Sequence, residues 1–421
     1  METIRIEKLV FGGQALGRAA SGQVVFVWNA LPGETVEVNI TKKSKTHWDG
    51  IAERVLEKSP ERIDPIEKHF LSCSPWQILS YEAENDWKVK IAEETYKKIG
   101  DLDLQLDIVH DTEPYHYRNK IEYSFAENSG KISLAFFERG KKFRFQILEC
   151  ILASREINQA ARVVLDWINE VKIPIRSLKS LIGRSTSDGK VALAMFIKDK
   201  LEFSSYPALD KNCLGFQLYY STHKSPASVP TELLYSQGQD YLISKIKGTK
   251  LKFGNLSFFQ VNSPVFEAAL EDMKKYLEPD SEALDLYSGV GSISIPLSAK
   301  IKSCTLVDSN VEAIELAKEN IDLNKLNNFE AVCRPTEEIT ELIKEDQTVF
   351  LDPPRAGLHE EVTKRLLSVK PKKIIYLSCD LATHARDVRL LKEKYNIVFS
   401  RLYNFFPRTP HIEGLVILKR R

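Results

Sequence analysis

The C-terminal third of the chain constrains the fold most, because strand-like and helix-like segments alternate there from about residue 280 onward. ALDLYS (283–288) is an apolar strand, and GSISIPLSAK (291–300) after it is predicted to be a helix. CTLVD (304–308) and the amphipathic NVEAIELAKENIDLNKL (310–326) repeat this order. Further strands are expected at TVFLD, IIYLS, IVFSRLYNF and GLVILK. Strands that alternate with helices indicate a parallel, doubly wound α/β domain.

The preceding part of the chain follows other patterns. Residues 1–58 contain short strand-like segments separated by Gly and Pro turns, which favours a small closed β-barrel. A helix is predicted for 82–98, antiparallel strands within 115–150 and a second helix for 155–171, and the pattern is mixed from there to about residue 250. The predicted domains are a barrel at 1–58, a central α+β domain at 59–250 and an α/β domain at 251–421.

Composition limits the class of protein. The chain has 421 residues, which at about 100–200 residues per domain suggests two to four domains. It is 43% hydrophobic and 28% charged, as a globular protein with a real core is. No stretch approaches ~18 consecutive apolar residues, and the N-terminal METIRIEKLVFGG lacks the features of a signal peptide. We therefore expect no membrane association and a cytoplasmic location.

The six cysteines are scattered and none forms a C-x-x-C pair. In a cytoplasmic protein this pattern indicates buried thiols or one catalytic thiol, with no disulfide framework and no metal site.

The net charge is only +1, so any surface for nucleic acid must be a local patch. Lys42, Lys43 and Lys45 lie close to His47 and Trp48, and charges beside an aromatic ring suit RNA. A solvated hairpin tip would have the same composition. Two other basic segments are candidates for phosphate contact, namely Arg139–Arg144 and Lys419–Arg421.

A glycine-containing turn, Asp285–Gly291, separates the first predicted strand of the α/β domain from the segment after it. Such turns let backbone N–H groups approach a ligand at the carboxyl ends of the strands. Asp308, at the end of the next strand, can bind ribose hydroxyls. A nicotinamide cofactor is one interpretation, but the third glycine of G-x-G-x-x-G is absent. S-adenosylmethionine has no phosphate and fits the turn better.

Three further segments hold candidate catalytic groups. Asp352 is followed by two prolines, which make either a stiff structural turn or the rim of an active site. Cys379 lies between a strand and a predicted helix, where the helix N-terminus is expected to lower the pKa of the thiol. A lone cysteine is more often a buried small hydrophobe. Glu413 precedes the last strand as a possible base or a plain charged residue, with His411 as the alternative base.

The sequence resembles the RNA uracil-5-methyltransferases that act on tRNA and large-subunit ribosomal RNA. The matching segments are LSYEAENDWK, YRNKIEYSF, FFQVN, DLYSGVG, LVDSNVEAIELAKEN, LDPPRAG, LSCDLATHARD and FFPRTPHIEGL. The N-terminal segment resembles the TRAM RNA-binding barrel, an OB-like fold, and the C-terminal domain the Rossmann-like methyltransferases. The resemblance also implies that residues 81–111 pack with the catalytic domain.

Carried over by motif, the resemblance assigns roles to single residues. Gln260, Tyr287, Asp308 and Asp352 would hold S-adenosylmethionine, Cys379 would be the nucleophile and Glu413 the base. Ser292 stands where the family often has a cofactor-contacting Asn.

The implied chemistry explains these residue types. A thiolate that adds to carbon 6 of uracil makes carbon 5 nucleophilic toward a methyl donor, and a base then removes the proton from carbon 5. The target uridine has to leave its stack to reach these groups.

The sequence departs from the family pattern in two places. Many members bind a 4Fe–4S cluster with four cysteines, whereas only Cys73 and Cys150 occupy matching positions here, and Glu67 and Trp76 stand near the others. Two thiolates cannot give four-thiolate ligation, so we expect no cluster. Asp380 follows the nucleophile where the family usually has Asn, and its charge would oppose thiolate formation.

The sequence also allows other interpretations. A non-catalytic RNA-binding or assembly factor would have lost Cys379 or Glu413, and a cytosine-5 methyltransferase has a different order of motifs. Because the barrel occurs mostly in the ribosomal RNA enzymes of the family, large-subunit rRNA is the expected substrate, with tRNA as the alternative. We expect a monomer.

Overall fold

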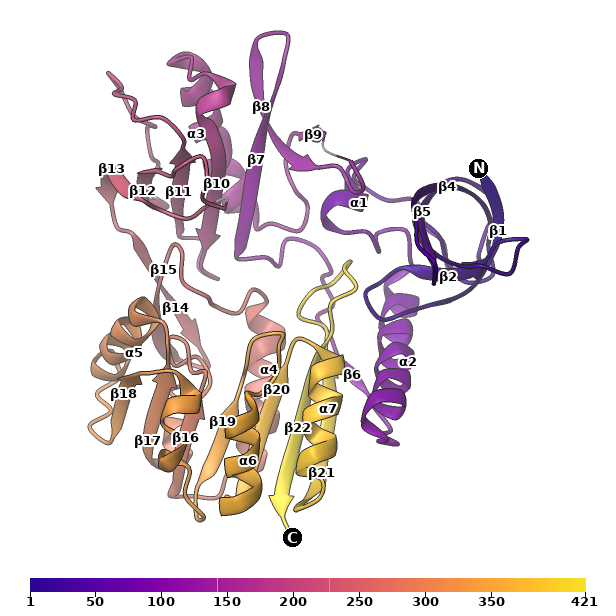
Figure 1. Cartoon of the computed structure of the whole chain (residues 1–421). Coiled ribbons are helices and arrows are strands. Elements are labelled where there is room, and N and C mark those ends of the chain that lie inside the picture. Colours follow the sequence, from indigo (N-terminus) through magenta and orange to yellow (C-terminus); the bar gives the residue numbers. More distant parts are fainter. Residues whose placement is uncertain (142, 227) are drawn as a thin grey trace.

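The computed structural model describes residues 1–141, 143–226 and 228–421, and it shows a barrel, a central sheet and a C-terminal α/β unit (Figure 1). The barrel is closed in the order β1-β2-β3-β5-β4. Its strands are β1 (Glu2–Leu9), β2 (Ala15–Arg18), β3 (Val24–Trp28), β4 (Thr35–Lys43) and β5 (Trp48–Glu57). Alternate apolar residues fill it, among them Ile4, Ile6, Val36 and Val38, none more than 2% exposed. The predicted barrel is therefore confirmed.

The central part is a seven-stranded sheet in the order β13-β12-β11-β10-β7-β8-β9. Its strands are β7 (Lys120–Asn128), β8 (Lys131–Phe137), β9 (Arg144–Ile147), β10 (Leu178–Ser185), β11 (Val191–Ile197), β12 (Cys213–Tyr220) and β13 (Glu232–Gly238). Helix α3 (Arg155–Glu170) packs on this sheet, and η1 (Ile175–Ser177) leads into β10. The separate hairpin of β14 (Tyr241–Ile246) and β15 (Thr249–Gly254) follows. The region whose pattern was mixed thus consists mainly of strands.

The C-terminal part is an eight-stranded sheet in the order β18-β17-β16-β19-β20-β22-β21-β6. Its strands are β6 (Ile108–Val109), β16 (Ser281–Leu286), β17 (Ile301–Asp308), β18 (Phe329–Cys333), β19 (Thr348–Leu351), β20 (Lys373–Ser378), β21 (Tyr395–Tyr403) and β22 (Glu413–Arg420). Its helices are α4 (Ser263–Lys275), α5 (Val311–Leu323), α6 (Glu360–Val369) and α7 (Leu381–Leu391), with short turns η2 (Ser298–Lys300), η3 (Thr336–Glu338) and η4 (Thr340–Leu342). The α/β fold is confirmed, although β22 runs antiparallel to β20 and β21.

The prediction of a helix at residues 291–300 is wrong. Turns occupy this segment and only η2 is helical. Pro296 has no N–H, so the carbonyl of Ser292 cannot receive the i→i+4 bond of an α-helix. The backbone therefore curls tightly after Gly291 instead of presenting a helix N-terminus.

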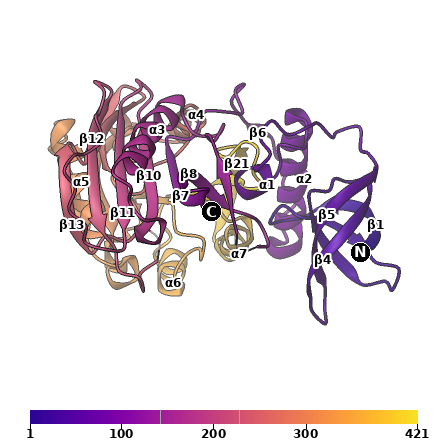
Figure 2. The same cartoon turned by 90° about the horizontal axis from the view of Figure 1, so that it is seen from above.

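Helix α2 (Tyr81–Gly100) packs mainly on the C-terminal unit, not on the central sheet. It packs along α7, and β6 extends the C-terminal sheet beside β21. Figure 2 shows α2 between the barrel and the remainder of the molecule. These contacts support the expected attachment of 81–111 to the C-terminal unit, while the domain bounds 1–58, 59–250 and 251–421 stay predictions. Among the described residues, no helix is long and apolar enough to cross a bilayer.

Candidate active site

A cavity of about 430 Å³ lies at the carboxyl ends of the parallel strands, which is within the usual size range of small-molecule sites. The strand order reverses between β16 and β19, and ligands of such sheets bind at this point. All seven side chains predicted for the site line the cavity, namely Gln260, Tyr287, Ser292, Asp308, Asp352, Cys379 and Glu413. Tyr287, Asp352 and Cys379 directly follow parallel strands, and Asp308 is the last residue of another. Parallel strands therefore bring these four residues, which are distant in the sequence, to one edge of the sheet.

The glycine turn after β16 has a backbone that suits close approach of a ligand. Tyr287, Gly289 and Gly291 all have positive φ, at 63°, 54° and 84°. A Cβ on Gly289 would meet no atom within 4 Å, so the backbone there is open, whereas a Cβ on Gly291 would lie 2.4 Å from Ile295 Cδ1. Gly291 is therefore required for the fold of the turn, and Gly289 leaves space beside the cavity.

Asp308 is fixed at the end of β17 by backbone donors. The N–H of Gly289 donates to its Oδ2 at 3.0 Å, and the N–H of Asn310 donates to its Oδ1 at 2.8 Å. The carboxylate is thereby held at the cavity wall with lone pairs left for ribose hydroxyls.

Two acids lie at the floor of the cavity: Asp285 is fully buried, and the half-buried Asp352 lines the cavity itself. Burial raises the pKa of Asp285 to about 7, and it raises the pKa of Asp352 to about 7 as well. Gln260 Nε2 donates to Asp352 Oδ2 at 3.4 Å. The residues fit S-adenosylmethionine: an open glycine turn, a placed carboxylate and acids whose ionisation a cation would favour.

Cys379 lies between β20 and α7, as expected, but the low pKa predicted for it is wrong. Burial raises the pKa of the thiol to about 12, the charges of Glu413 and Asp352 add to this, and Arg355 opposes it. These effects outweigh the helix N-terminus. Asp380 is the N-cap of α7 and accepts from the N–H of Ala382 and Thr383, a role that Asn and Asp share, which accounts for the departure from the family pattern.

Glu413 reaches the cavity because of the antiparallel strand. β22 pairs with β20 so that Gly414 lies opposite Ser378, which places Glu413 next to Cys379 in the register. The side chain is 4% exposed, and burial, with a contribution from Asp352, raises its pKa well above the ordinary value. His411 instead lines a different hollow, and burial lowers its pKa to about 4. The geometry thus favours Glu413 over His411 as the base.

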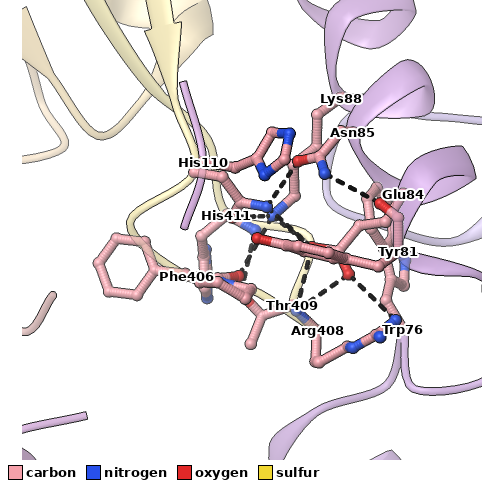
Figure 3. A network of polar contacts seen from close by, with 12 residues as sticks. Trp76, Tyr81, Glu84, Asn85, Lys88, His110, Phe406, Arg408, Thr409 and His411 are labelled. Atoms are coloured by element: carbon pink, nitrogen blue, oxygen red, sulfur yellow. Dashed lines mark hydrogen bonds and ion pairs between the residues drawn. The ribbon is translucent and has the colours of Figure 1, made fainter. Parts of the chain in front are cut away.

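The loop that leads to Glu413 is held on α2 by a buried polar network (Figure 3). Glu84 accepts from the backbone N–H of Arg408, and Lys88 Nζ lies 3.0 Å from Glu84 Oε1. Lys88 also donates to Asn404 Oδ1 at 2.6 Å and to the carbonyl of Phe406 at 3.2 Å. The loop, residues 404–412, is therefore positioned by a helix some 320 residues earlier in the chain.

Sequence reasoning missed several residues of this site. Glu84 and Lys88 lie in a matching segment, LSYEAENDWK, yet nothing in that segment shows its partner. Phe258 lines the cavity and is 67% exposed, and Arg355 acts on the pKa of both catalytic candidates. The FFQVN and LDPPRAG segments were the available signals for these two.

A second hollow of about 550 Å³, the barrel groove, lies between the barrel, the central sheet and the 404–412 loop. It is lined by Gly12 and Trp28 of the barrel, by Arg118, Lys120 and Arg139, and by Pro410 and His411. The guanidinium of Arg139 lies 4.0 Å over the Trp28 ring. Because His411 borders the groove and Glu413 the cavity, the loop joins the two.

The structure places the three basic segments in different parts of the molecule. Lys43 lies over the Trp48 ring, with its Nζ 4.1 Å from the centroid, at the end of the β4–β5 hairpin. Arg139 borders the barrel groove, while Lys142 lies outside the described residues. Lys419 pairs with Lys373 at the start of β20, so the terminal segment lies at the edge opposite the cavity and the structure does not bring it to the site.

The residues at the position of the family's iron–sulfur cluster do not fit it. Glu67, His69, Cys73 and Cys150 gather there, and only two of them are thiols. A 4Fe–4S cluster held by four thiolates cannot form with this donor set.

Together the fold and the cavity define an α/β transferase that binds a nucleoside-type ligand at the strand switch point, beside a thiol and a carboxylic acid. The chain belongs to the tRNA (Uracil-5-)-methyltransferase family, whose model matches residues 81–421. A TRAM domain model matches residues 2–50. The protein is thus an S-adenosylmethionine-dependent RNA (uracil-5-)-methyltransferase, as the sequence predicted.

Other RNA methyltransferases are similar in sequence to this chain over nearly its whole length. An uncharacterized RNA methyltransferase of Clostridium tetani is 27% identical, over 96% of this chain and 93% of its own. An uncharacterized RNA methyltransferase of Aquifex aeolicus is 28% identical, over 99% and 98%. The solved tRNA (uracil-54, C5)-methyltransferase of Pyrococcus abyssi, in complex with S-adenosyl-L-homocysteine, matches with a TM-score of 0.80 at 25% identity, over 99% of this chain and all of that one.

Proposed function

We propose that the protein methylates carbon 5 of a uridine in large-subunit rRNA, with Cys379 as the nucleophile and Glu413 as the base. The observation that carries the chemistry is the placement of a thiol, a carboxylic acid and an open glycine turn around one cavity. The thiolate of Cys379 adds to carbon 6, carbon 5 takes the methyl group, and Glu413 removes the proton from carbon 5. The thiolate then leaves and the ring double bond returns.

The cofactor residues follow from the same geometry. S-adenosylmethionine, when bound, supplies an electrophilic methyl group on a cationic sulfonium. Gln260, Tyr287, Ser292, Asp308 and Asp352 would hold it, with Asp308 accepting from the ribose. Phe258 offers an exposed ring at the rim for stacking on a planar base.

The charge state of the site has to change before reaction. The raised pKa of Cys379, about 12, keeps the thiol protonated at neutral pH, and burial shifts the pKa of Glu413 toward the protonated form as well. Arg355 lowers both pKa values, and a positive charge in the cavity acts in the same direction. A cationic sulfonium in the cavity would therefore favour the thiolate of Cys379.

The barrel groove supports RNA as the substrate. Its arginines and lysine can meet phosphates, and Trp28 and His411 offer aromatic rings beside them. RNA that lies in the groove passes the 404–412 loop, from which a flipped uridine can enter the cavity.

The proposal also specifies the class of RNA that is methylated. Large-subunit rRNA follows from the resemblance of the barrel to that of the ribosomal RNA enzymes. The second candidate is tRNA, which is favoured by the match of the Pyrococcus abyssi tRNA enzyme along the whole chain, barrel included. A cytoplasmic location and a monomeric state belong to the proposal as well.

A methyl-transfer assay tests it. Protein and labelled S-adenosylmethionine are incubated with unmodified large-subunit rRNA or with bulk tRNA, and the nucleosides are separated by mass spectrometry. We expect 5-methyluridine in rRNA, lost in Cys379→Ala and kept in Cys333→Ala, which removes an exposed cysteine outside the cavity. Label found only in tRNA would contradict the proposed substrate. Label kept in both cysteine variants, or lost in both, would contradict the proposed mechanism.

A trapped adduct tests the base. Fluorine at carbon 5 of the target uridine cannot be removed as a proton, so the Cys379 adduct should persist on gels. Glu413→Gln should accumulate the same kind of adduct with ordinary uridine, because proton removal becomes the slow step. A Glu413→Gln variant of full activity would exclude this residue as the base.

A further inference from the structure

Four side chains with metal-ligating atoms converge outside the active site. One ligand atom from each of Glu67, His69, Cys73 and Cys150 lies within 4.8 Å of all the others. Three come from the segment that links the barrel to α2, which includes α1 (Phe70–Cys73), and Cys150 follows β9 of the central sheet. In a tetrahedral zinc site the ligand atoms lie roughly 3.3–3.8 Å apart, so a small contraction brings this set to coordination distance.

One member of the cluster has a buried polar atom that faces the others. His69 is 7% exposed, and its Nε2 makes no hydrogen bond although it lies 3.3 Å from Glu67 Oε1, an ion pair only when the ring is protonated. A buried polar atom that lacks a hydrogen bond costs free energy, and a cation between these two groups would satisfy both.

The surroundings hold the other ligands in place. Gln77 Nε2 donates to Glu67 Oε2 at 3.0 Å, and the backbone N–H of Ile151 donates to Oε1 at 2.6 Å. Cys150 is fully buried, and Asn158 bonds both its backbone N–H and its carbonyl. Outer hydrogen bonds of this kind orient metal ligands in structural sites.

We propose that Glu67, His69, Cys73 and Cys150 form a mononuclear Zn²⁺ site that fastens the α1 segment to the central sheet beside the barrel groove. Two thiols, an imidazole and a carboxylate are the donors that zinc takes in tetrahedral geometry, and all four positions are filled by protein, as in closed structural sites. The site is separate from the active-site cavity, and none of its residues line that cavity.

The position of the site gives it a structural purpose. Cys73 lines the barrel groove together with Arg118 and Arg139, and Arg139 Nε donates to the carbonyl of Leu71 in α1. A metal that holds α1 to the sheet therefore fixes one wall of the groove. Two thiolates and a carboxylate leave the loaded site with net negative charge, which these two arginines offset.

The first test uses the full chain, expressed in medium that supplies both zinc and iron and purified without chelators. Elemental analysis should give about one zinc per chain that survives dialysis. X-ray absorption at the zinc edge should show two sulfur ligands at ~2.3 Å and two nitrogen or oxygen ligands at ~2.0–2.1 Å. Four sulfur ligands, iron with acid-labile sulfide, no bound metal, or a Cys73–Cys150 disulfide would each overturn the proposal.

The second test uses variants. Cys150→Ser and His69→Gln should lose the zinc, whereas Cys213→Ser, which changes another buried cysteine of the central part, should keep it. Addition of a chelator to the wild-type chain should lower its melting temperature, and zinc should restore it. This measurement tests whether bound zinc stabilises the fold even where a variant fails to fold. Retention of one zinc by both Cys150→Ser and His69→Gln would contradict the assignment.

Discussion

The buried carboxylate of Glu84 accepts the backbone N–H of Arg408, 3.0 Å from each oxygen, across 324 residues of sequence. Arg408 has a positive φ of 64°, and its guanidinium donates to the carbonyl of Leu79 at 2.7 Å. A strained residue in the loop before Glu413 is thus held from both its backbone and its side chain by α2 and the residues before it. The position of the proposed base depends on a helix at the other end of the chain.

Glu84→Gln should damage both stability and catalysis. The amide keeps an acceptor for Arg408 but leaves the fully buried Lys88 without its anionic partner. Removal of one member of a buried ion pair costs about 3–5 kcal/mol, so chemical denaturation should show a loss of that order. Methyl-transfer assays should show a fall in kcat, since the loop that carries Glu413 loosens.

The matched control is Glu82→Gln, which changes an exposed glutamate in the first turn of the same helix. It should change the free energy of unfolding by less than about 0.5 kcal/mol. Equal losses in both variants would mean that the pairing of Glu84 is not what holds the loop.

Arg355→Ala should move the pH dependence of methyl transfer. Arg355 lowers the pKa of both Cys379 and Glu413, so its removal raises both and shifts the acid limb of kcat/KM to higher pH, by about one pH unit for a partly solvated charge. Rates measured across a pH series check this. Arg355→Lys keeps the charge and should restore most of the wild-type profile, and an unmoved acid limb in Arg355→Ala would rule out an electrostatic role.

The stability of the ligand-free protein should fall as pH rises toward neutrality. Asp352 has its pKa raised from 3.8 to about 7 on folding, so the folded state binds the extra proton between these values. Its contribution is present below about pH 4 and is lost as pH rises through about 7; at about 1.4 kcal/mol per pKa unit it amounts to roughly 4 kcal/mol. Denaturation at several pH values should show a shallower fall for Asp352→Asn than for the wild type.

Asp86→Asn serves as its control, because Asp86 is exposed on α2 and does not line the cavity. It should leave the slope of stability against pH as in the wild type. A wild-type slope in Asp352→Asn as well would show that this acid titrates normally in the fold.

Lys42→Ala combined with Lys45→Ala should weaken RNA binding for every sequence. Both side chains are exposed at the β4–β5 hairpin of the barrel. Loss of each phosphate contact reduces the slope of log binding constant against log salt concentration by about one. Binding isotherms at several salt concentrations measure both effects.

Lys419→Ala combined with Arg421→Ala removes the same charge at the opposite edge of the C-terminal sheet. RNA affinity should stay within about twofold of the wild type. A larger effect there than at the barrel would reverse the proposed orientation of the RNA.

The sequence by itself determined the edge of the sheet where the chemistry lies. Tyr287, Asp308, Asp352 and Cys379 each lie at or directly after the end of an apolar strand, and parallel strands present their carboxyl ends on one side. Local patterning also predicted the barrel and α2, because period-2 and period-3.6 hydrophobic patterns are properties of a few neighbouring residues. The ordered motifs then indicated the family.

Only the tertiary structure decided what depends on contacts between distant segments. Glu413 enters the cavity because β22 inserts antiparallel between β20 and β21, and no local pattern specifies strand order or direction. The pKa of Cys379 is set by burial and by two acids from other strands, which overrides the local helix terminus from which a low pKa was expected. The convergence of Cys73 and Cys150 has the same origin: packing energy, summed over the whole chain, brings together residues whose local sequences do not indicate each other.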